Sequence, residues 1–365
     1  MKRNNLKWAL PLAALCLLTT ACSKDNETEP TDGKTRSLTI SCGIGETDSK
    51  ADTRASVMPN NPDESKEKFI WHKGDALRAF LIPEGSVDFD NGATSFSIDE
   101  NYDDANPSNV ASFSSSFPTG SYQMLATYRG SGVTFDKTSN SGELSFRFFT
   151  DPQIGKNDTR HLKYNMCMYA IATVTDKNVP SLTFHHLSSL FRFTVTNNNS
   201  SACRISSISV KNSSGNRIFG THYTFKVTNW ENGTIDIKNG TAGDMNAASI
   251  EQTLQDPADA NKGIELSGTG NSFDAYTIIG PNAPLTGETL EFVIKVTDID
   301  GTKERTYTSL ALDADKIIEA NKGATTWEMG KRYWFNLVLD SELTVSIAGV
   351  TPLPGWGTED GETEI

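Results

Sequence analysis

Apolar and polar residues alternate along much of the chain, and this two-residue period is the pattern of half-buried β-strands. Turn clusters such as Asp300-Gly301 separate the alternating segments and predict tight connections between them. Only residues 313–322 predict a helix, with Ile317 and Ile318 facing inward. The clearest alternating segments are residues 38–44, 77–82, 96–98, 144–148, 166–170, 182–184, 190–195, 205–210, 223–227, 290–296, 333–339 and 343–347.

Many short strands joined by tight turns predict an all-β protein built of antiparallel β-sandwiches, not of alternating strands and helices. We predict two sandwiches, because a polar break at residues 176–180 lies near the middle of the chain and precedes a new strand. The predicted organisation is a signal peptide at 1–21, a lipidated flexible tether at 22–37, an N-terminal β-sandwich domain at 38–178, a C-terminal β-sandwich domain at 179–350 and an acidic tail at 351–365.

The N-terminus carries a secretory signal. Lys2, Arg3 and Lys7 precede an apolar run over residues 8–18, which is too short to span a bilayer. A cysteine, Cys22, follows this run directly, as in the lipobox of bacterial lipoproteins. The resemblance implies that Cys22 is lipidated and anchors a surface-exposed lipoprotein of the outer membrane, since two acyl chains give stable binding. A plain cleaved signal peptide is the alternative.

Charge excludes one class of partner. The 365 residues have a net charge of −13, with 33 Lys and Arg against 46 Asp and Glu. Loss of residues 1–21 removes three basic residues and no acidic one, so the mature chain carries −16. Nucleic acid is not an expected partner, because binding phosphates requires clustered Lys and Arg and the chain has no such cluster.

The sequence offers no constellation for catalysis, a metal or a cofactor. His185 and His186 are neighbours on a predicted strand, so they point to opposite faces and cannot chelate one ion together. Residues 298–301 imitate the start of a calcium loop but are better explained as a tight turn between two strands. The tryptophans predict packing more than sugar stacking. We therefore expect no enzyme activity, no cofactor and no metal.

Three cysteines remain in the body of the chain: Cys42, Cys167 and Cys203. Their spacing does not match a metal site or a disulfide framework. Each lies at a strand-like position, where a thiol behaves as a small buried hydrophobe. We expect core cysteines, and a Cys167–Cys203 bridge stays open because sequence does not give geometry.

Several segments together resemble one family. They are the lipobox with its acidic tether, Thr53-Arg54-Ala55, and the runs at 71–77, 182–187, 190–193 and 327–336. In this order they are similar to the fimbrillin (Mfa-like) family of Bacteroidetes type V pilus lipoproteins. The resemblance covers nearly the whole mature chain. It implies two transthyretin-like β-sandwiches and a structural or adhesive subunit of a fimbrium (pilus).

The resemblance also implies assembly by strand exchange. An arginine-specific protease would cut between Arg54 and Ala55, with Arg36 as second choice, and release an N-terminal strand. A strand of the next subunit would then fill the vacated groove, so that other fimbrial subunits are the partners, head to tail. The displaced strand would hold Leu38, Ile40, Cys42 and Ile44. The donor strand would hold either Tyr333, Phe335, Leu337 and Leu339, or Leu343, Val345 and Ile347.

Two other functions remain in competition. The first is a non-polymerising surface lipoprotein that binds a glycan or host matrix through exposed aromatic residues such as Trp356. The second is a secreted hydrolase on a β-sandwich. The sequence leaves open whether a fimbrial subunit of this kind would be stalk, tip or anchor, what ligand it would hold, and whether Arg54 is cleaved.

Overall fold

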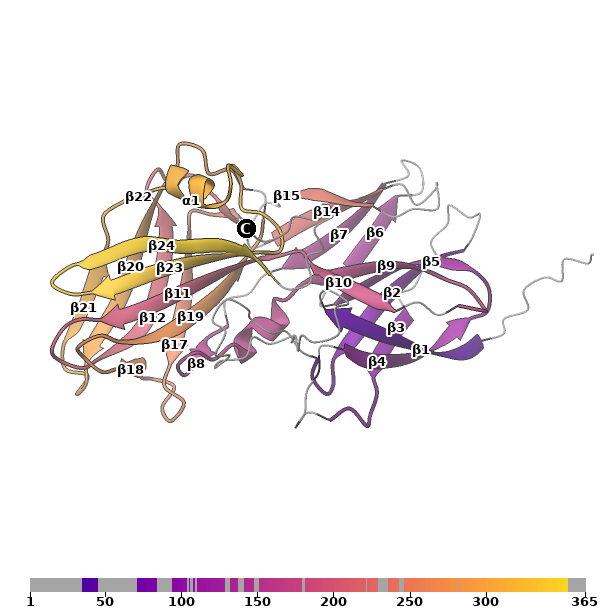
Figure 1. Ribbon diagram of the computed structural model, residues 1–365, viewed down its shortest axis with the longest axis horizontal. Helices are drawn as coiled ribbons and strands as arrows, with labels where there is room; N and C mark the ends of the chain where they lie inside the picture. Colours follow the sequence, from indigo (N-terminus) through magenta and orange to yellow (C-terminus); the bar gives the residue numbers. More distant parts are fainter. Residues whose placement is uncertain are drawn as a thin grey trace, which may run out of the picture. The chain divides into compact units, whose positions relative to one another are not determined.

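The protein is nearly all β, which confirms the predicted class (Figure 1). In the computed structural model, the described residues all belong to one compact unit that begins at Thr35. The structure describes residues 35–44, 71–83, 94–103, 105, 108, 110–128, 132–136, 141–147, 151–178, 181–220, 222–228, 236–242, 246–281 and 283–353.

Seven strands form a closed barrel in the order β1-β10-β9-β5-β2-β3-β4. Their bounds are β1 (Thr35–Ile44), β2 (Ala76–Pro83), β3 (Thr94–Ile98), β4 (Val110–Pro118), β5 (Tyr122–Tyr128), β9 (Met168–Val174) and β10 (Leu182–His186). None of these seven strands contains an Asp or Glu, although the chain has 46. The only ionisable basic side chains in these seven strands are two arginines and the two histidines of β10, so the barrel wall is largely uncharged.

A first hydrophobic cluster fills the barrel around Trp71, which is 0% exposed. Alternation produces this core: Phe96 of β3 and Phe113 of β4 point inward, and the serines beside them point outward. A further sheet, in the order β15-β14-β7-β6, adds apolar residues to the same cluster. Its strands are β6 (Gly132–Asp136), β7 (Ser141–Arg147), β14 (His222–Thr228) and β15 (Asp236–Ala242).

Two more sheets enclose a second hydrophobic cluster, which includes Phe193, Phe292 and Phe335. One sheet has the order β19-β11-β23-β24, and the other has the order β21-β20-β12-β17-β8, with β18 and β22 paired to it at the side. Their strands are β8 (Gln153–Ile154), β11 (Ser189–Asn197), β12 (Cys203–Asn212), β17 (Ser249–Gln255), β18 (Ile264–Leu266), β19 (Asn271–Ile279), β20 (Thr289–Asp298), β21 (Glu304–Thr308), β22 (Leu312–Asp313), β23 (Lys331–Leu339) and β24 (Leu343–Pro352).

The minor elements are few. A two-stranded sheet joins β13 (Phe219–Gly220) to β16 (Asn246–Ala247). The predicted helix is present as α1 (Asp315–Ala320), with Ile317 buried, and a short 3-10 helix, η1 (Arg160–Tyr164), was not predicted. Among the described residues, no helix has the length and apolar character to cross a membrane.

Most strand pairings are antiparallel, as predicted, and three are parallel: β1 with β10, β11 with β23, and β17 with β8. The predicted domain boundary at residues 178/179 falls in the connection between β9 and β10. After this boundary, β10 still pairs with β9 and β1 of the barrel. The domain limits and the transthyretin-like arrangement stay predictions.

Two smaller interpretations agree with the structure. Residues 298–301 form the turn between β20 and β21, where the N–H of Gly301 donates to the carbonyl of Asp298 at 2.8 Å and Gly301 has a φ of +74°. The three cysteines of the body are buried thiols with no disulfide between them, and Cys167 and Cys203 lie in different hydrophobic clusters.

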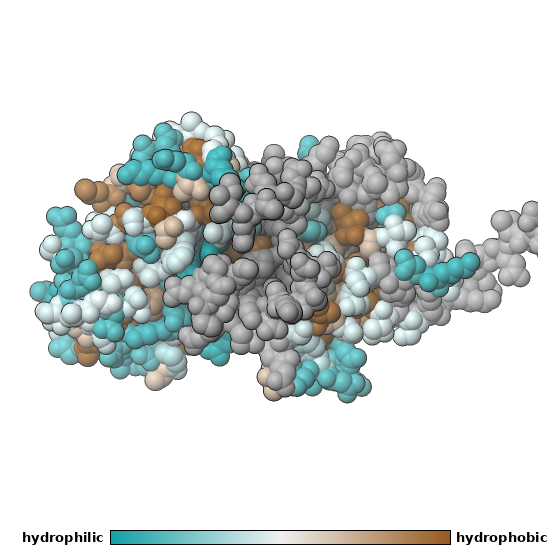
Figure 2. Space-filling view, in the orientation of Figure 1, coloured by the Kyte–Doolittle hydropathy of each residue, from teal (hydrophilic) through white to brown (hydrophobic). Residues whose placement is uncertain are grey.

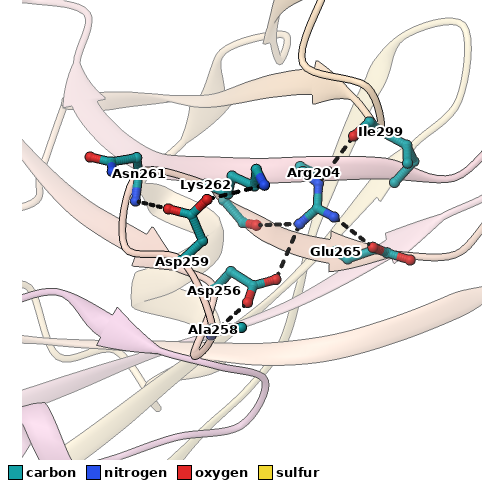
Figure 3. Close-up of polar contacts among 9 residues, drawn as sticks. Arg204, Asp256, Ala258, Asp259, Asn261, Lys262, Glu265 and Ile299 are labelled. Carbon is teal, nitrogen blue, oxygen red and sulfur yellow. Dashed lines mark hydrogen bonds and ion pairs between the residues drawn. The ribbon is translucent and has the colours of Figure 1, made fainter.

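One arginine ties the loop after β17 to its neighbours (Figure 3). Arg204 of β12 donates to Asp256 at 3.1 Å, to Glu265 at 2.9 Å and to the carbonyl of Ile299 at 3.4 Å. The backbone N–H of Ala258 and then the guanidinium of Arg204 hold the pKa of Asp256 below its usual value. Arg204 is thus paired with both carboxylates, Asp256 and Glu265, so we assign this group of residues a structural role.

Acid should weaken the fold through His161 of η1. This side chain is buried and its Nε2 lies 2.9 Å from the carbonyl oxygen of Tyr276. Burial lowers the pKa of His161 below 6.5, against the opposing effects of that carbonyl, Asp158 and Asp151. The unfolded chain therefore takes up the proton first, so stability present above about pH 6.5 is lost as the pH falls below it.

We expect the free energy of unfolding in urea to drop between about pH 7 and about pH 5, and His161→Gln to reduce that drop. The amide of Gln can donate to the same carbonyl but does not titrate in this range. An equal drop in the variant would assign the pH dependence to other groups.

Candidate functional site

Strand β1 occupies a slot in the barrel wall between β4 and β10. It is antiparallel to β4 over nearly its whole length, with Thr35 opposite Pro118 and Gly43 opposite Val110. It is parallel to β10 only over residues 42–44. Most of β1 is therefore held by a ladder on one edge, and only its last residues are held on both.

Ile40 and Cys42 of β1 point into the core, as the alternation predicted. Ile40 is 1% exposed and Cys42 is 0% exposed, whereas Thr39, directly before Ile40, faces outward. Register places Leu38 opposite Ser115 and Ile44 opposite Phe184. Burial raises the pKa of the Cys42 thiol, so this side chain packs as a neutral group.

Two side-chain hydrogen bonds add to the ladder. The hydroxyls of Thr39 and Ser114 lie 2.9 Å apart across β1 and β4. The indole N–H of Trp71 donates to the carbonyl oxygen of Cys42 at 3.0 Å, from inside the core.

The sequence-predicted processing sites are not described equally well. Cys22, Arg54 and Ala55 lie outside the described residues, so their roles stay predictions. Arg36 lies within β1, opposite Phe117 of β4. A protease needs extended, unpaired backbone, which makes Arg36 a poor substrate while β1 is paired.

The first donor candidate, β23, is an interior strand. It is parallel to β11 on one edge and antiparallel to β24 on the other. Tyr333, Phe335, Leu337 and Leu339 are all buried in the second cluster. Removal of β23 would break two ladders and open this core.

The second donor candidate, β24, is the edge strand of the same sheet and pairs along its length only with β23 (Figure 1). Val345 and Ile347 are half-buried, and Thr344 and Ser346 are exposed. In this view apolar surface is mixed with hydrophilic surface over the sheet that carries β23 and β24 (Figure 2). No residue of β24 is charged, so the edge lacks the charged side chains that commonly block strand addition, although a β-bulge opposite Trp334 and Phe335 and the terminal Pro352 interrupt it.

The two candidate strands resemble each other in sequence. Residues 38–43 of β1 read Leu-Thr-Ile-Ser-Cys-Gly, and residues 343–348 of β24 read Leu-Thr-Val-Ser-Ile-Ala. Three positions are identical, one exchanges Ile for Val, and the apolar residues keep the same alternation. The match is not part of a repeat with a fixed period, because the two copies lie about 300 residues apart.

The remaining candidate residues belong to the core or to structural contacts. His186 is buried and His185 is half-buried, as two faces of one strand require. Trp71 and Trp327 are 0% exposed, which fits the packing interpretation. Trp334 is half-buried, with the guanidinium of Arg192 lying 4.1 Å from its ring centre. Within the described residues, no three His, Cys, Asp or Glu side chains are grouped to hold a metal.

Comparison with known proteins gives a family match over most of the chain. The model of the fimbrillin-like family matches residues 53–352. No curated protein matches the chain at a significant level.

Similar solved structures include proposed cell adhesion proteins of Bacteroides uniformis (16% identity, TM-score 0.46, covering 89% of this chain and 99% of that chain) and Bacteroides ovatus (13%, 0.47, 90% and 100%). They also include the tip fimbrial protein Mfa3 of Porphyromonas gingivalis (8%, 0.37, 86% and 100%).

Proposed function

The chain belongs to the fimbrillin-like family, and from this premise we propose that it is a structural or adhesive fimbrial subunit that joins its neighbours by strand exchange. One observation carries the proposal: a strand in the barrel wall, β1, has a near copy in β24, an uncharged strand at the edge of another sheet. A segment with the same alternation can make the same ladder with β4 and present apolar side chains to the same core.

In the proposed pathway the subunit reaches the outer membrane surface as a lipoprotein anchored through Cys22. An arginine-specific protease then cuts after Arg54, which separates residues 38–44 from the barrel. The slot between β4 and β10 is filled by β24 of another copy. Because donor and slot lie on different parts of the chain, the contact is head to tail and repeats without closing, as a filament requires.

The geometry favours β24 over β23 as donor. An edge strand leaves its sheet by breaking one ladder, whereas β23 would have to break two. Position by position, Val345 would replace Ile40 and Ile347 would replace Cys42. Ile is larger than Cys, and a shift of two residues keeps the alternation while placing Ile347 at Ile40 and Gly349 at Cys42.

Cleavage favours replacement of the subunit's own β1 by the donor strand of another copy. While β1 is covalently attached to the barrel, it rebinds the slot intramolecularly, so its effective concentration there is far higher than that of a free peptide. After a cut, the same strand is an ordinary peptide that is lost by dilution. A donor strand carried by a folded subunit can then displace it, although the two sequences bury similar side chains.

Trimming should convert a monomer into a polymer. We expect wild-type protein, after treatment with an arginine-specific protease, to give ladders that resist SDS on unheated gels. Arg54→Ala should remain uncut between β1 and Trp71 and remain monomeric, whereas Arg36→Ala should be trimmed and polymerise like wild type.

Trimmed protein that stays monomeric at high concentration would refute the strand-exchange role. Binding to a glycan array by such a monomer, lost in Trp356→Ala, would instead support the non-polymerising surface lipoprotein.

A further inference from the structure

Trp71 connects the part of the chain that would remain to the part that would leave. Its indole N–H donates to the carbonyl of Cys42 at 3.0 Å. Trp71 follows Arg54 in the sequence and Cys42 precedes it, so a cut after Arg54 leaves donor and acceptor on different fragments. An indole has one N–H donor and no acceptor, so its only conventional hydrogen bond is one that it donates to an acceptor such as a backbone carbonyl.

The indole is held rigidly. The backbone N–H of Trp71 donates to the carbonyl of Ser108 at 3.1 Å, and the hydroxyl of Tyr102 donates to the carbonyl of Trp71 at 2.8 Å. Three rings surround it edge to face, with centroids at 5.0 Å for Phe113, 5.4 Å for Tyr128 and 5.5 Å for Phe184. The ring is 0% exposed, so it cannot turn its N–H to water without disturbing the core.

We propose that Trp71 is a positioning residue of the strand slot, whose N–H requires a backbone carbonyl from whichever strand occupies it. In the single subunit this carbonyl comes from Cys42. In a polymer it would come from the donor strand of a second copy, a part of the inference that rests on the proposed function. When the slot empties, the indole N–H loses this acceptor, and only an occupant that places a carbonyl at the same point restores the bond.

The position of the bond adds a length requirement. Cys42 is where β1 begins to pair with β10 as well as with β4. A strand that stops short of this point would make the ladder with β4 but leave the indole without an acceptor. Trp71 would thereby favour occupants that reach the β10 end of the slot, whatever side chains they carry.

Hydrogen exchange in the intact full-length chain tests the role of Trp71 without any cleavage. Trp71→Phe keeps an aromatic ring and removes the N–H, and we expect amides of residues 38–44 to exchange about tenfold faster, as loss of one buried hydrogen bond implies. Trp327→Phe is the matched control. Trp327 is also 0% exposed and donates to a backbone carbonyl, that of Ile218 at 3.1 Å, but in the second cluster. Equal exchange of β1 in wild type and Trp71→Phe would overturn the proposal.

A peptide experiment tests the occupant. Protein trimmed after Arg54 is titrated with a peptide of residues 35–44, and with the same peptide carrying an ester in place of the amide between Cys42 and Gly43, which weakens the Cys42 carbonyl as acceptor. We expect the ester to weaken binding about tenfold in wild type and clearly less in Trp71→Phe. An ester between Ile40 and Ser41 should cost the same in both proteins.

The outcomes separate the two proposals. An ester penalty that is the same in Trp71→Phe as in wild type would overturn the role of Trp71 while leaving strand exchange intact. Failure of trimmed protein to bind any of the peptides would overturn strand exchange, whereas the exchange rates of β1 in the uncut chain would still decide whether Trp71 holds this strand.

Discussion

Replacing Val345 and Ile347 together by Asp should abolish polymerisation and leave a folded monomer. In their own sheet both side chains are half-buried, so carboxylates there keep contact with water. In the slot Ile347 would take the place of Cys42 or, in the shifted register, of Ile40, and these residues are 0% and 1% exposed. A buried carboxylate without a partner costs several kcal/mol, so strand binding should weaken by on the order of a thousandfold or more.

The same strand offers a matched control. Thr344→Asp with Ser346→Asp adds equal charge on the exposed face of β24, and this variant should polymerise after trimming. Both proteins are compared by unheated SDS gels, and thermal unfolding of the untrimmed monomers checks that each is folded. Ladders from the Val345 and Ile347 variant would rule out β24 as the donor and return attention to β23.

A disulfide between β1 and β4 should block polymerisation until it is reduced. Thr39 and Ser114 are paired in register, and their hydroxyl oxygens lie 2.9 Å apart. Directly opposite residues of an antiparallel pair have Cα atoms about 4.5–5.5 Å apart, which is within the range that a disulfide bridges. After trimming, the bond would keep β1 in the slot although the chain is cut, so no donor could enter.

We expect Thr39→Cys with Ser114→Cys to remain monomeric after trimming in oxidising buffer and to form ladders once a reductant is added. The single variants, which cannot form this bridge, should polymerise in both buffers. The native thiols are buried, which limits their interference. Polymerisation of the oxidised double variant would show that β1 does not need to leave.

Sequence alternation predicted most of the strands, because a two-residue period is a local property, but it did not predict β4 or β5 of the barrel. Strand β5 is buried continuously from Met124 to Tyr128 and therefore does not alternate. The inward positions of Ile40 and Cys42, the turn at residues 298–301 and the small helix at α1 follow from the same kind of local evidence. The buried thiols also agree, since a cysteine on the inner face of a strand packs like a small apolar residue.

Strand partners could not be predicted in this way. Alternation is the same whether a neighbour is parallel or antiparallel, so the parallel pairs β1 with β10 and β11 with β23 had no signal in the sequence. The bond from Trp71 to Cys42 depends on a contact between residues about 30 positions apart. The match between β1 and β24 is present in the sequence, but finding it requires comparing the strands with one another.

The barrel strands contain no carboxylate, so the negative charge of the protein lies outside the strands that would pair between copies. Repulsion between copies and the contacts within the slot therefore depend on different residues. Copies of a strongly anionic protein repel each other at a distance, and dissolved ions weaken that repulsion. Strands β4 and β10 of the slot and both candidate occupants, β1 and β24, contain no carboxylate, so the proposed pairing would depend on backbone hydrogen bonds and apolar contacts and on no ion pair within these strands. A fibre of this chain would therefore gain from ionic strength while it forms and lose little to it afterwards.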